Sequence, residues 1–165
     1  MSDQPESGLH EAVPYDAAAP NDAARRIIDA NSYLVLATVD ESGHPWATPV
    51  WFAAVGREQF FWISRADARH SRNIAASPVV GIVVFDSSAP AGQAEAAYFE
   101  AEAGEVTADD HAHALGVYNT RSLAQGIRAW TEADVTGEAA HRLYRATVSA
   151  VSLLEGGDHR VPLSS

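Results

Sequence analysis

The chain has 165 residues and a formal net charge of −11, from 22 acidic and 11 basic residues. A single domain of this length can bury a substantial core, and the acidic balance argues against nucleic acid or an anionic membrane surface as the main partner. The sequence contains neither lysine nor cysteine, which excludes Schiff-base catalysis, a Walker-type phosphate lysine, disulfides and cysteine-ligated metal sites.

The N-terminal segment, residues 1–20, is polar and acidic, and prolines interrupt it. It contains no apolar stretch typical of a secretion signal, and no run of 18 apolar residues occurs anywhere in the chain. We therefore expect a flexible N-terminal arm, one folded domain over residues 21–165, and a cytoplasmic protein.

The first half of the domain is predicted to contain one helix followed by strands. Asn21 can cap a helix over residues 22–31. The pattern then changes to alternating, β-branched and aromatic residues, which predicts three strands joined by short turns: 33–40, 46–55 and 60–64. A nearly continuous apolar run, 79–86, is typical of a strand that is buried on both faces.

The second half continues with a strand expected over residues 96–107. Asp109 and Asp110 are well placed to begin a helix, because carboxylates are favourable at a helix N-terminus. Residues 121–137 have no clear period and are predicted to form a loop or lid, and a last strand is expected over 142–156. Antiparallel strands joined mostly by hairpins favour a mainly β fold, a closed or split barrel with a few short helices, since closure removes exposed edges.

Positive charge is concentrated in residues 62–86, a predicted strand, short helix and second strand. If Asp67 caps this helix, Arg69 and Arg72 share one helical face and Arg65 lies just before it. Repulsion at this spacing costs about 0.2 to 0.5 kcal/mol per pair, which carboxylates elsewhere in the chain can offset. Arginines at a helix N-terminus also suit a phosphate monoester. The residues alone leave a solvated basic helix and an anion site both open.

Few other residues suggest chemistry. His111 and His113 point about 200° apart on a helix and cannot chelate together, so no metal site is predicted. Trp51 is a strand aromatic that belongs either to the core or interface or to a ligand pocket, and Trp130, in the 121–137 segment, is a candidate for covering a bound substrate or cofactor. No Ser-His-Asp arrangement or pair of carboxylates identifies a catalytic residue.

Three segments in order resemble the flavin-binding split barrels related to pyridoxamine 5′-phosphate oxidase. YLVLATVDESGHPWATPVWF is similar to the family's opening hairpin, and WISRADARHSRNIAASPVVGIVVFD to its strand, phosphate-binding turn, helix and strand. YRATVSAVSLLEGGDHRV is similar to its last strand and Gly-Gly turn. The resemblance covers roughly residues 25–160. It implies a homodimeric split β-barrel that binds flavin mononucleotide (FMN) across the dimer interface and acts on a small molecule.

The resemblance also implies which residues bind the cofactor. They are Thr48, Pro49, Val50, Trp51, Ile63, Ser64, Arg65, Arg69, His70, Ser71, Arg72 and Gln93. Arg69 and His70 stand where the family has an Arg-Lys pair that grips the phosphate. A neutral imidazole offers one donor where an ammonium group offers a fixed charge. This departure leaves a deazaflavin coenzyme open as an alternative cofactor.

The C-terminal segment GGDHRVPLSS departs from the family pattern. Arg160 fits the first position of the Arg-x-His pair and is, with Trp130, a candidate substrate-binding residue, but Pro162 stands where the histidine belongs. Pyridoxine-series chemistry is therefore not expected. The predicted function is FMN-dependent hydride transfer to an unknown small molecule. The alternatives are a deazaflavin-dependent reductase, a flavin-binding protein without turnover, and an empty barrel that serves as an interaction module.

Overall fold

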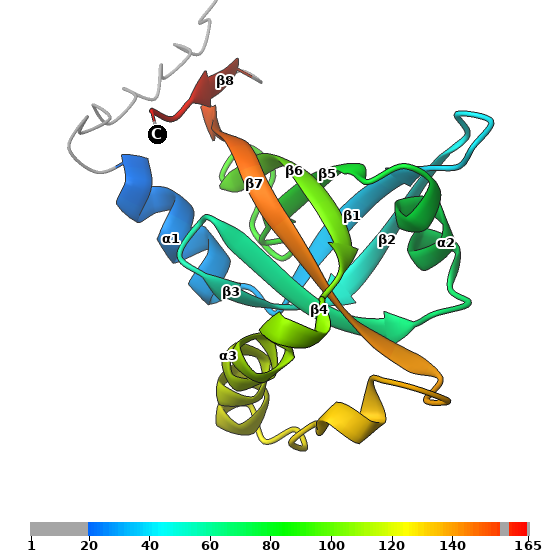
Figure 1. The fold of residues 1–165 in the computed structure, drawn as a ribbon. Helices are drawn as coiled ribbons and strands as arrows, with labels where there is room; N and C mark the ends of the chain where they lie inside the picture. The colour runs from blue at the N-terminus through cyan, green and yellow to red at the C-terminus, as the bar shows by residue number, and fades with distance from the viewer. Residues whose placement is uncertain (1–19, 156–158, 165) are drawn as a thin grey trace, which may run out of the picture.

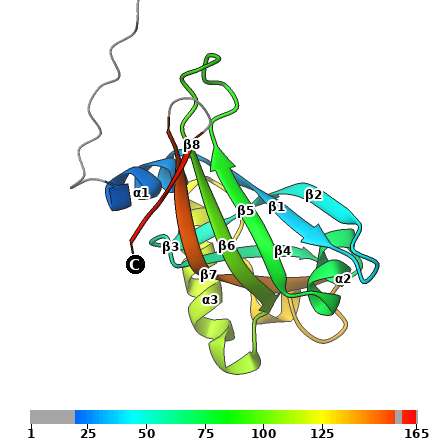
Figure 2. The same cartoon turned by 90° about the horizontal axis from the view of Figure 1, so that it is seen from above.

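The structure is a computed structural model that describes residues 20–155 and 159–164. The predicted N-terminal arm, residues 1–20, lies outside the described residues apart from Pro20. Within those residues, eight strands form one curled antiparallel sheet with three α-helices around it (Figures 1 and 2). The prediction of a mainly β, split-barrel fold with a few short helices is confirmed.

The strands run in the order β2-β1-β5-β6-β7-β4-β3, with β8 paired to β7. The strands are β1 (Tyr33–Val39), β2 (Pro45–Trp51), β3 (Ala53–Val55), β4 (Gln59–Arg65), β5 (Val79–Phe85), β6 (Ala96–Glu105), β7 (His141–Glu155) and β8 (His159–Pro162). The helices are α1 (Pro20–Ala30), α2 (Arg69–Ala76) and α3 (His111–Ala124), with short 3-10 helices η1 (Ala108–Asp110) and η2 (Glu132–Asp134). In both views α1 and α2 lie at opposite ends of the barrel (Figures 1 and 2).

Three element boundaries differ from the sequence prediction. The strand predicted over 46–55 is divided at the buried Phe52 into β2 and β3, which pair with different neighbours, β1 and β4. The C-terminal tail contains β8, which alternation alone did not indicate. Helix α1 begins at Pro20, so Asn21 lies in its first turn, and proline is favoured there because it needs no hydrogen-bond partner for an N–H.

Strand β7 holds the two parts of the sheet together. Its first half pairs with β4 over His141–Thr147, and the segment Tyr144–Leu153 pairs with β6. The register shifts opposite Glu100 and leaves Ser149 as an extra residue, whose hydroxyl donates to the Glu100 carbonyl at 3.1 Å. Such a bulge bends and twists a strand, and this one lies just beyond the segment of β7 that pairs with β4.

The core has two parts, because β4 is buried on both faces. Phe60 and Trp62 point into the barrel, where Phe60 makes edge contacts with the Phe52 and Phe99 rings at 5.5 and 4.9 Å. Phe61 points the other way, into a second cluster beneath α3. Side chains alternate between the faces of a strand, so the run of aromatic residues in β4 fills both clusters.

The segment predicted as a loop or lid, residues 121–137, begins in the last turn of α3 and is held against that helix. Asn119 donates to the Trp130 carbonyl and accepts from its N–H, both at 2.8 Å, and the Ser122 hydroxyl donates to the Arg128 carbonyl at 2.7 Å. In the part of the chain that the structure covers, no helix has the length and apolar character needed to cross a membrane.

We predict that Phe60→Ala lowers the free energy of unfolding by about 3 to 5 kcal/mol, because it leaves a cavity between two other rings in a fully buried position. Leu123→Ala, on the exposed surface of α3, should change it by no more than about 0.5 kcal/mol. Urea denaturation followed by tryptophan fluorescence measures both. Equal losses in the two variants would contradict the assignment of Phe60 to the barrel core.

Candidate functional site

The basic cluster of the sequence lies where β4 ends and α2 begins. Arg65 is the last residue of β4, and Arg69 is the first residue of α2. A tight turn joins them, because the Ala68 N–H and the Ser71 hydroxyl both donate to the Arg65 carbonyl, at 3.1 and 2.8 Å. This turn brings arginines from a strand and from a helix to one end of the barrel.

The N-terminus of α2 has no side-chain cap. Ala68 is the N-cap residue, so the prediction that Asp67 caps the helix is wrong. The first backbone bond of the helix runs from the Arg72 N–H to the Ala68 carbonyl at 3.1 Å. The N–H groups of the preceding helical residues lack partners within the helix, and they carry the positive end of its dipole. An anion is the natural partner for such a terminus.

Asp67 instead binds Arg65. Its two carboxylate oxygens accept from Arg65 Nε at 2.8 Å and from Arg65 Nη2 at 2.9 Å, and its carbonyl accepts from Arg72. The hydrogen bonds and charge of this pair lower the pKa of Asp67 and raise the pKa of Arg65. The guanidinium of Arg65 is therefore already occupied by a carboxylate, in a two-pronged geometry that also suits phosphate.

Arg69 lies between α2 and the β1–β2 hairpin. Its guanidinium stands 4.6 Å from the centroid of the Trp46 ring and 3.8 Å from an oxygen of Asp40. The N–H groups of Ser42 and His44 donate to Asp40 at 2.9 Å each, and these bonds lower the pKa of its carboxyl group. The hairpin turn and α2 enclose a cavity of about 320 Å³ beside Arg72. The Arg69 side chain is 42% exposed, so it is accessible to a ligand at this end.

The remaining polar residues of α2 turn inward. Ser71 and Asn73 are buried, and the Asn73 amide donates to the Thr38 hydroxyl at 3.0 Å, which fixes α2 on β1. Among the described residues the buried His70 Nε2 has no hydrogen-bond partner. Burial lowers the pKa of His70, which favours the neutral imidazole. The fixed positive charge at this site therefore comes from the arginines.

The predicted site residues of β2 divide between its two faces. Thr48 and the buried Val50 pair with inward-facing residues of β1, whereas Pro49 is exposed on the other face. The Trp51 indole donates to Gln125 at 2.9 Å, and its ring meets Tyr118 at 4.9 Å between centroids. Trp51 is thus engaged by α3.

The β4 residues before Arg65 are also split by alternation. Ile63 packs into the cluster beneath α3, and Ser64 is half-buried on the opposite face. The end of β4 and the start of α2 therefore bring Ser64, Arg65, Arg69 and Arg72 to one end of the barrel. Alternation places Ser64 on the barrel face of β4, and Ile63 with Arg65 on the opposite face.

Two predicted site residues lie far from α2 within the chain. Gln93 is in the exposed loop after β5, whereas α2 precedes β5, and the loop and α2 lie at opposite ends of that strand (Figure 2). Arg160 lies on β8, with its guanidinium 4.1 Å from the centroid of the Tyr98 ring.

Trp130 lies near the end of β4, where the basic cluster begins. It is half-buried, with the Arg128 guanidinium 3.8 Å from its ring centroid on one side and the His141 ring at 5.4 Å. His141 is the strand partner of Arg65. The Asp134 carboxylate lies 3.3 Å from the Arg128 guanidinium, so both Arg128 and Trp130 already have partners within the chain.

Sequence reasoning missed the roles of two carboxylates. Asp67 was expected as a cap, although its position two residues after Arg65 was a signal for a local ion pair. The sequence pattern places Asp40 only at the end of the predicted strand 33–40. Its approach to Arg69 depends on how the hairpin packs against α2, which no local pattern reveals.

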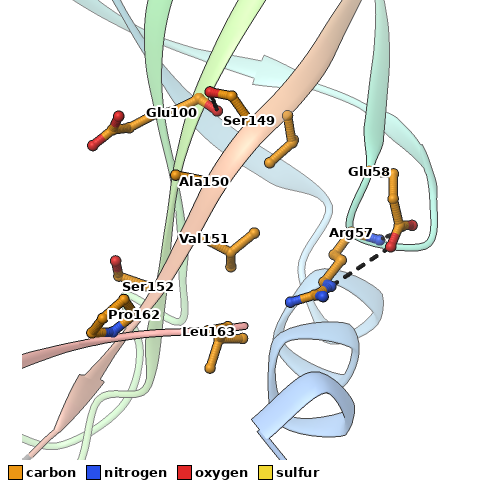
Figure 3. Close-up of a pocket in the computed structure, with 10 residues that line it drawn as sticks. Arg57, Glu58, Glu100, Ser149, Ala150, Val151, Ser152, Pro162 and Leu163 are labelled. Carbon is orange, nitrogen blue, oxygen red and sulfur yellow. Dashed lines mark hydrogen bonds and ion pairs between the residues drawn. The ribbon is translucent and has the colours of Figure 1, made fainter. Parts of the chain in front are cut away.

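A cavity of about 490 Å³ lies elsewhere, beside β7 (Figure 3). The cavity is bounded by β7, by the turn before β4 and by the C-terminal segment. Arg57 lines the cavity, but its guanidinium already has partners, since it stands 3.6 Å from Glu58 and donates to the Ser164 carbonyl at 2.9 Å. Glu58 and Glu100 also line this cavity. The lining of this cavity contains one arginine, whereas three arginines and an uncapped helix terminus lie at the end of β4 and the start of α2, which is therefore the candidate anion site.

Comparison of the fold finds similar solved structures at low sequence identity. A heme-binding protein from Mycobacterium smegmatis is 20% identical with a TM-score of 0.71, over 92% of this chain and 60% of that one. HutZ, a heme storage protein from Vibrio cholerae, is 22% identical with a TM-score of 0.61, over 81% and 94%. A putative pyridoxamine 5′-phosphate oxidase from Listeria innocua is 13% identical with a TM-score of 0.60, over 81% and 97%.

The chain thus spans less than two thirds of the mycobacterial protein. At these identities the likeness establishes the fold alone. No curated protein matches the sequence. A family model, described as pyridoxamine 5′-phosphate oxidase, matches residues 20–155, which is most of the chain. By sequence and by fold, this chain belongs to the pyridoxamine 5′-phosphate oxidase family.

Proposed function

We propose that the chain is an FMN-binding oxidoreductase that holds the phosphate of the cofactor at the N-terminus of α2. The single observation that carries the proposal is the uncapped start of this helix with Arg65, Arg69 and Arg72 around it, in a chain of net charge −11. Free N–H groups and guanidinium groups together are the donor set that a phosphate monoester requires. Family membership supports flavin as the remainder of the ligand.

The residues at this site fit a phosphate, but the positive charge differs from the family pattern, because Arg69 and His70 stand where the family has an Arg-Lys pair. Arg69 supplies a fixed cation beside the helix terminus, whereas the half-buried His70, with its lowered pKa, does not. The Ser64 hydroxyl at the end of β4 offers a further donor. Bound FMN would supply hydride transfer, and the chain would bind, orient and shield it.

We further propose a homodimer formed by the outer face of the sheet. On β1 and β5, the side chains opposite the core are apolar or absent, and they leave Val79 63% and Phe85 38% exposed. A cavity of about 260 Å³ on this face is lined by Glu100 and Arg160, among others. An exposed apolar face with charges of both signs suits a two-fold contact with a second copy.

A deazaflavin coenzyme is the alternative cofactor on the same site. The observation in its favour is that the residue directly after Arg69 is a histidine and not a fixed cation. Arg65 and Arg72 instead extend the positive charge along the turn. Such a spread of charge also suits a longer anionic tail. Tight binding of the deazaflavin coenzyme together with weak binding of FMN would favour it.

Heme is a further candidate ligand, supported by the heme-binding proteins among the structural relatives. In this chain His159 is exposed on β8, one residue before Arg160, which lines the outer-face cavity. A histidine nitrogen can bind heme iron, and an arginine can pair with a propionate. An absorbance change on hemin addition that His159→Ala abolishes would favour this ligand over a flavin.

The first prediction for the proposed site is that Arg69→Ala weakens FMN binding by about 10- to 100-fold, because it removes a charge-assisted hydrogen bond worth roughly 1.5 to 3 kcal/mol. Equilibrium titration followed by tryptophan fluorescence measures the dissociation constant. Arg25→Ala, on the exposed surface of α1, is the matched control. Binding of riboflavin, which lacks the phosphate, should not change in Arg69→Ala. Wild-type affinity for FMN in that variant would exclude the proposed phosphate site.

The second prediction concerns acid stability. The pKa of His70 is lower in the folded chain than its ordinary value of 6.5, so the unfolded chain binds the proton more readily. The stability from neutral His70 is complete above about pH 6.5 and falls as the pH drops through that value. Melting temperatures between pH 7.5 and 5 should fall less in His70→Gln than in the wild type. His159→Gln, at an exposed position, should keep the wild-type slope, and equal slopes in all three proteins would refute the prediction.

The third prediction is that Ala37→Arg converts a dimer into a monomer, because a bulky charge is placed at the centre of the outer face opposite Gly81. Sedimentation velocity measures the change, with Ala112→Arg on the exposed surface of α3 as the control. If the cofactor lies across the interface, Ala37→Arg also loses FMN affinity. A monomeric wild type, or an unchanged dimer in Ala37→Arg, would contradict this interface.

A further inference from the structure

We propose that Asp67 is a built-in competing anion, which occupies the guanidinium of Arg65 until the phosphate of a ligand displaces it. The inference rests on the proposed phosphate site and identifies a residue that sets the affinity of that site. Asp67 would hold the affinity below what the arginines alone provide, and it would act only on ligands that carry the phosphate.

The geometry of the pair is that of a bound oxyanion. The two oxygens of Asp67 lie 2.8 and 2.9 Å from Nε and Nη2 of Arg65, along one edge of the guanidinium. A phosphate uses the same edge with two of its oxygens. Phosphate and Asp67 therefore cannot both make this contact, and the binding of one requires the release of the other.

Asp67 has no evident structural duty that would require its carboxylate. The cap of α2 is Ala68, and the turn is closed by the Arg65 carbonyl, which accepts from Ala68 and Ser71. Arg72 contacts the backbone carbonyl of Asp67, which a substitution of its side chain retains. Both side chains of the Arg65–Asp67 pair are more than half exposed, and an exposed pair of this kind adds little stability.

The second carboxylate of the site, Asp40, differs in these respects. It stands farther from its arginine, 3.8 Å from Arg69, and the turn after β1 uses it, since Ser42 and His44 donate to it. Asp40 is thus a part of the hairpin, whereas Asp67 is free to swing away. Among the described residues, Asp67 is the carboxylate that pairs with Arg65.

The competition has a consequence for ligand choice. A phosphate monoester carries close to two negative charges at neutral pH and can replace the single charge of Asp67 at Arg65. A neutral ligand gains nothing from displacing it. Removal of the Asp67 charge should therefore tighten binding of FMN and inorganic phosphate, and leave binding of riboflavin unchanged.

The test compares wild type, Asp67→Asn and Asp109→Asn as full-length proteins. Asp109 is exposed in η1, and the described residues give it no ion pair, so its substitution matches the change in net charge. We expect Asp67→Asn to bind FMN about two- to fivefold more tightly in low salt, a gain that shrinks toward 1 M salt because the pair is exposed. Inorganic phosphate should likewise compete with FMN at a lower concentration, and equal melting temperatures confirm that the variants are folded.

The outcomes separate the inference from the proposed function. Tight FMN binding by the wild type, with Asp67→Asn equal to or weaker than Asp109→Asn, overturns the role of Asp67 and leaves the phosphate site standing. Binding by Asp67→Asn alone supports the competing anion and refutes FMN as a ligand of the wild type. A gain that riboflavin shares would also overturn the inference, because the competition requires a phosphate. Binding of neither FMN nor phosphate by any of the proteins overturns both.

Discussion

The structure depends on the pairing of one long strand with two neighbours. β7 pairs with β4 on one edge and with β6 on the other, and its segment Tyr144–Thr147 pairs with both. The extra residue at Ser149 bends the strand after this shared segment. The aromatic run of β4 is buried between the barrel and α3, and the end of β4 at Arg65 is held beside His141 and against α2.

Local charge balance explains how an acidic chain can display a basic site. Arg65 pairs with Asp67 and Arg69 lies near Asp40, whereas the exposed Arg72 contacts the backbone carbonyl of Asp67, and His70 is half-buried with a lowered pKa. Two of the three arginines are therefore balanced by carboxylates in the free chain. Under the proposed function, a phosphate would replace a carboxylate at Arg65. The acidic surplus elsewhere in the chain lowers its general attraction for anions.

Much of the candidate site was visible in the sequence, but its composition changed in three dimensions. The clustering of Arg65, Arg69 and Arg72 could be predicted because a short turn joins a strand to a helix, and these contacts are local. Gln93 and Arg160 were assigned by resemblance, and within one chain they lie away from α2, since β5 and β8 carry them elsewhere. The inward turn of His70 could not be predicted, because it depends on how α2 packs against β1.

The sequence by itself determined the mainly β class, most strand positions and the basic helix, because alternation, turn residues and charge spacing act over a few neighbours. Only the tertiary structure decided that Phe52 divides one predicted strand into two, and that the C-terminal tail adds a strand to β7. It also decided that the 121–137 segment is held to α3. These features depend on partners that lie far away along the chain, and only packing selects among such partners.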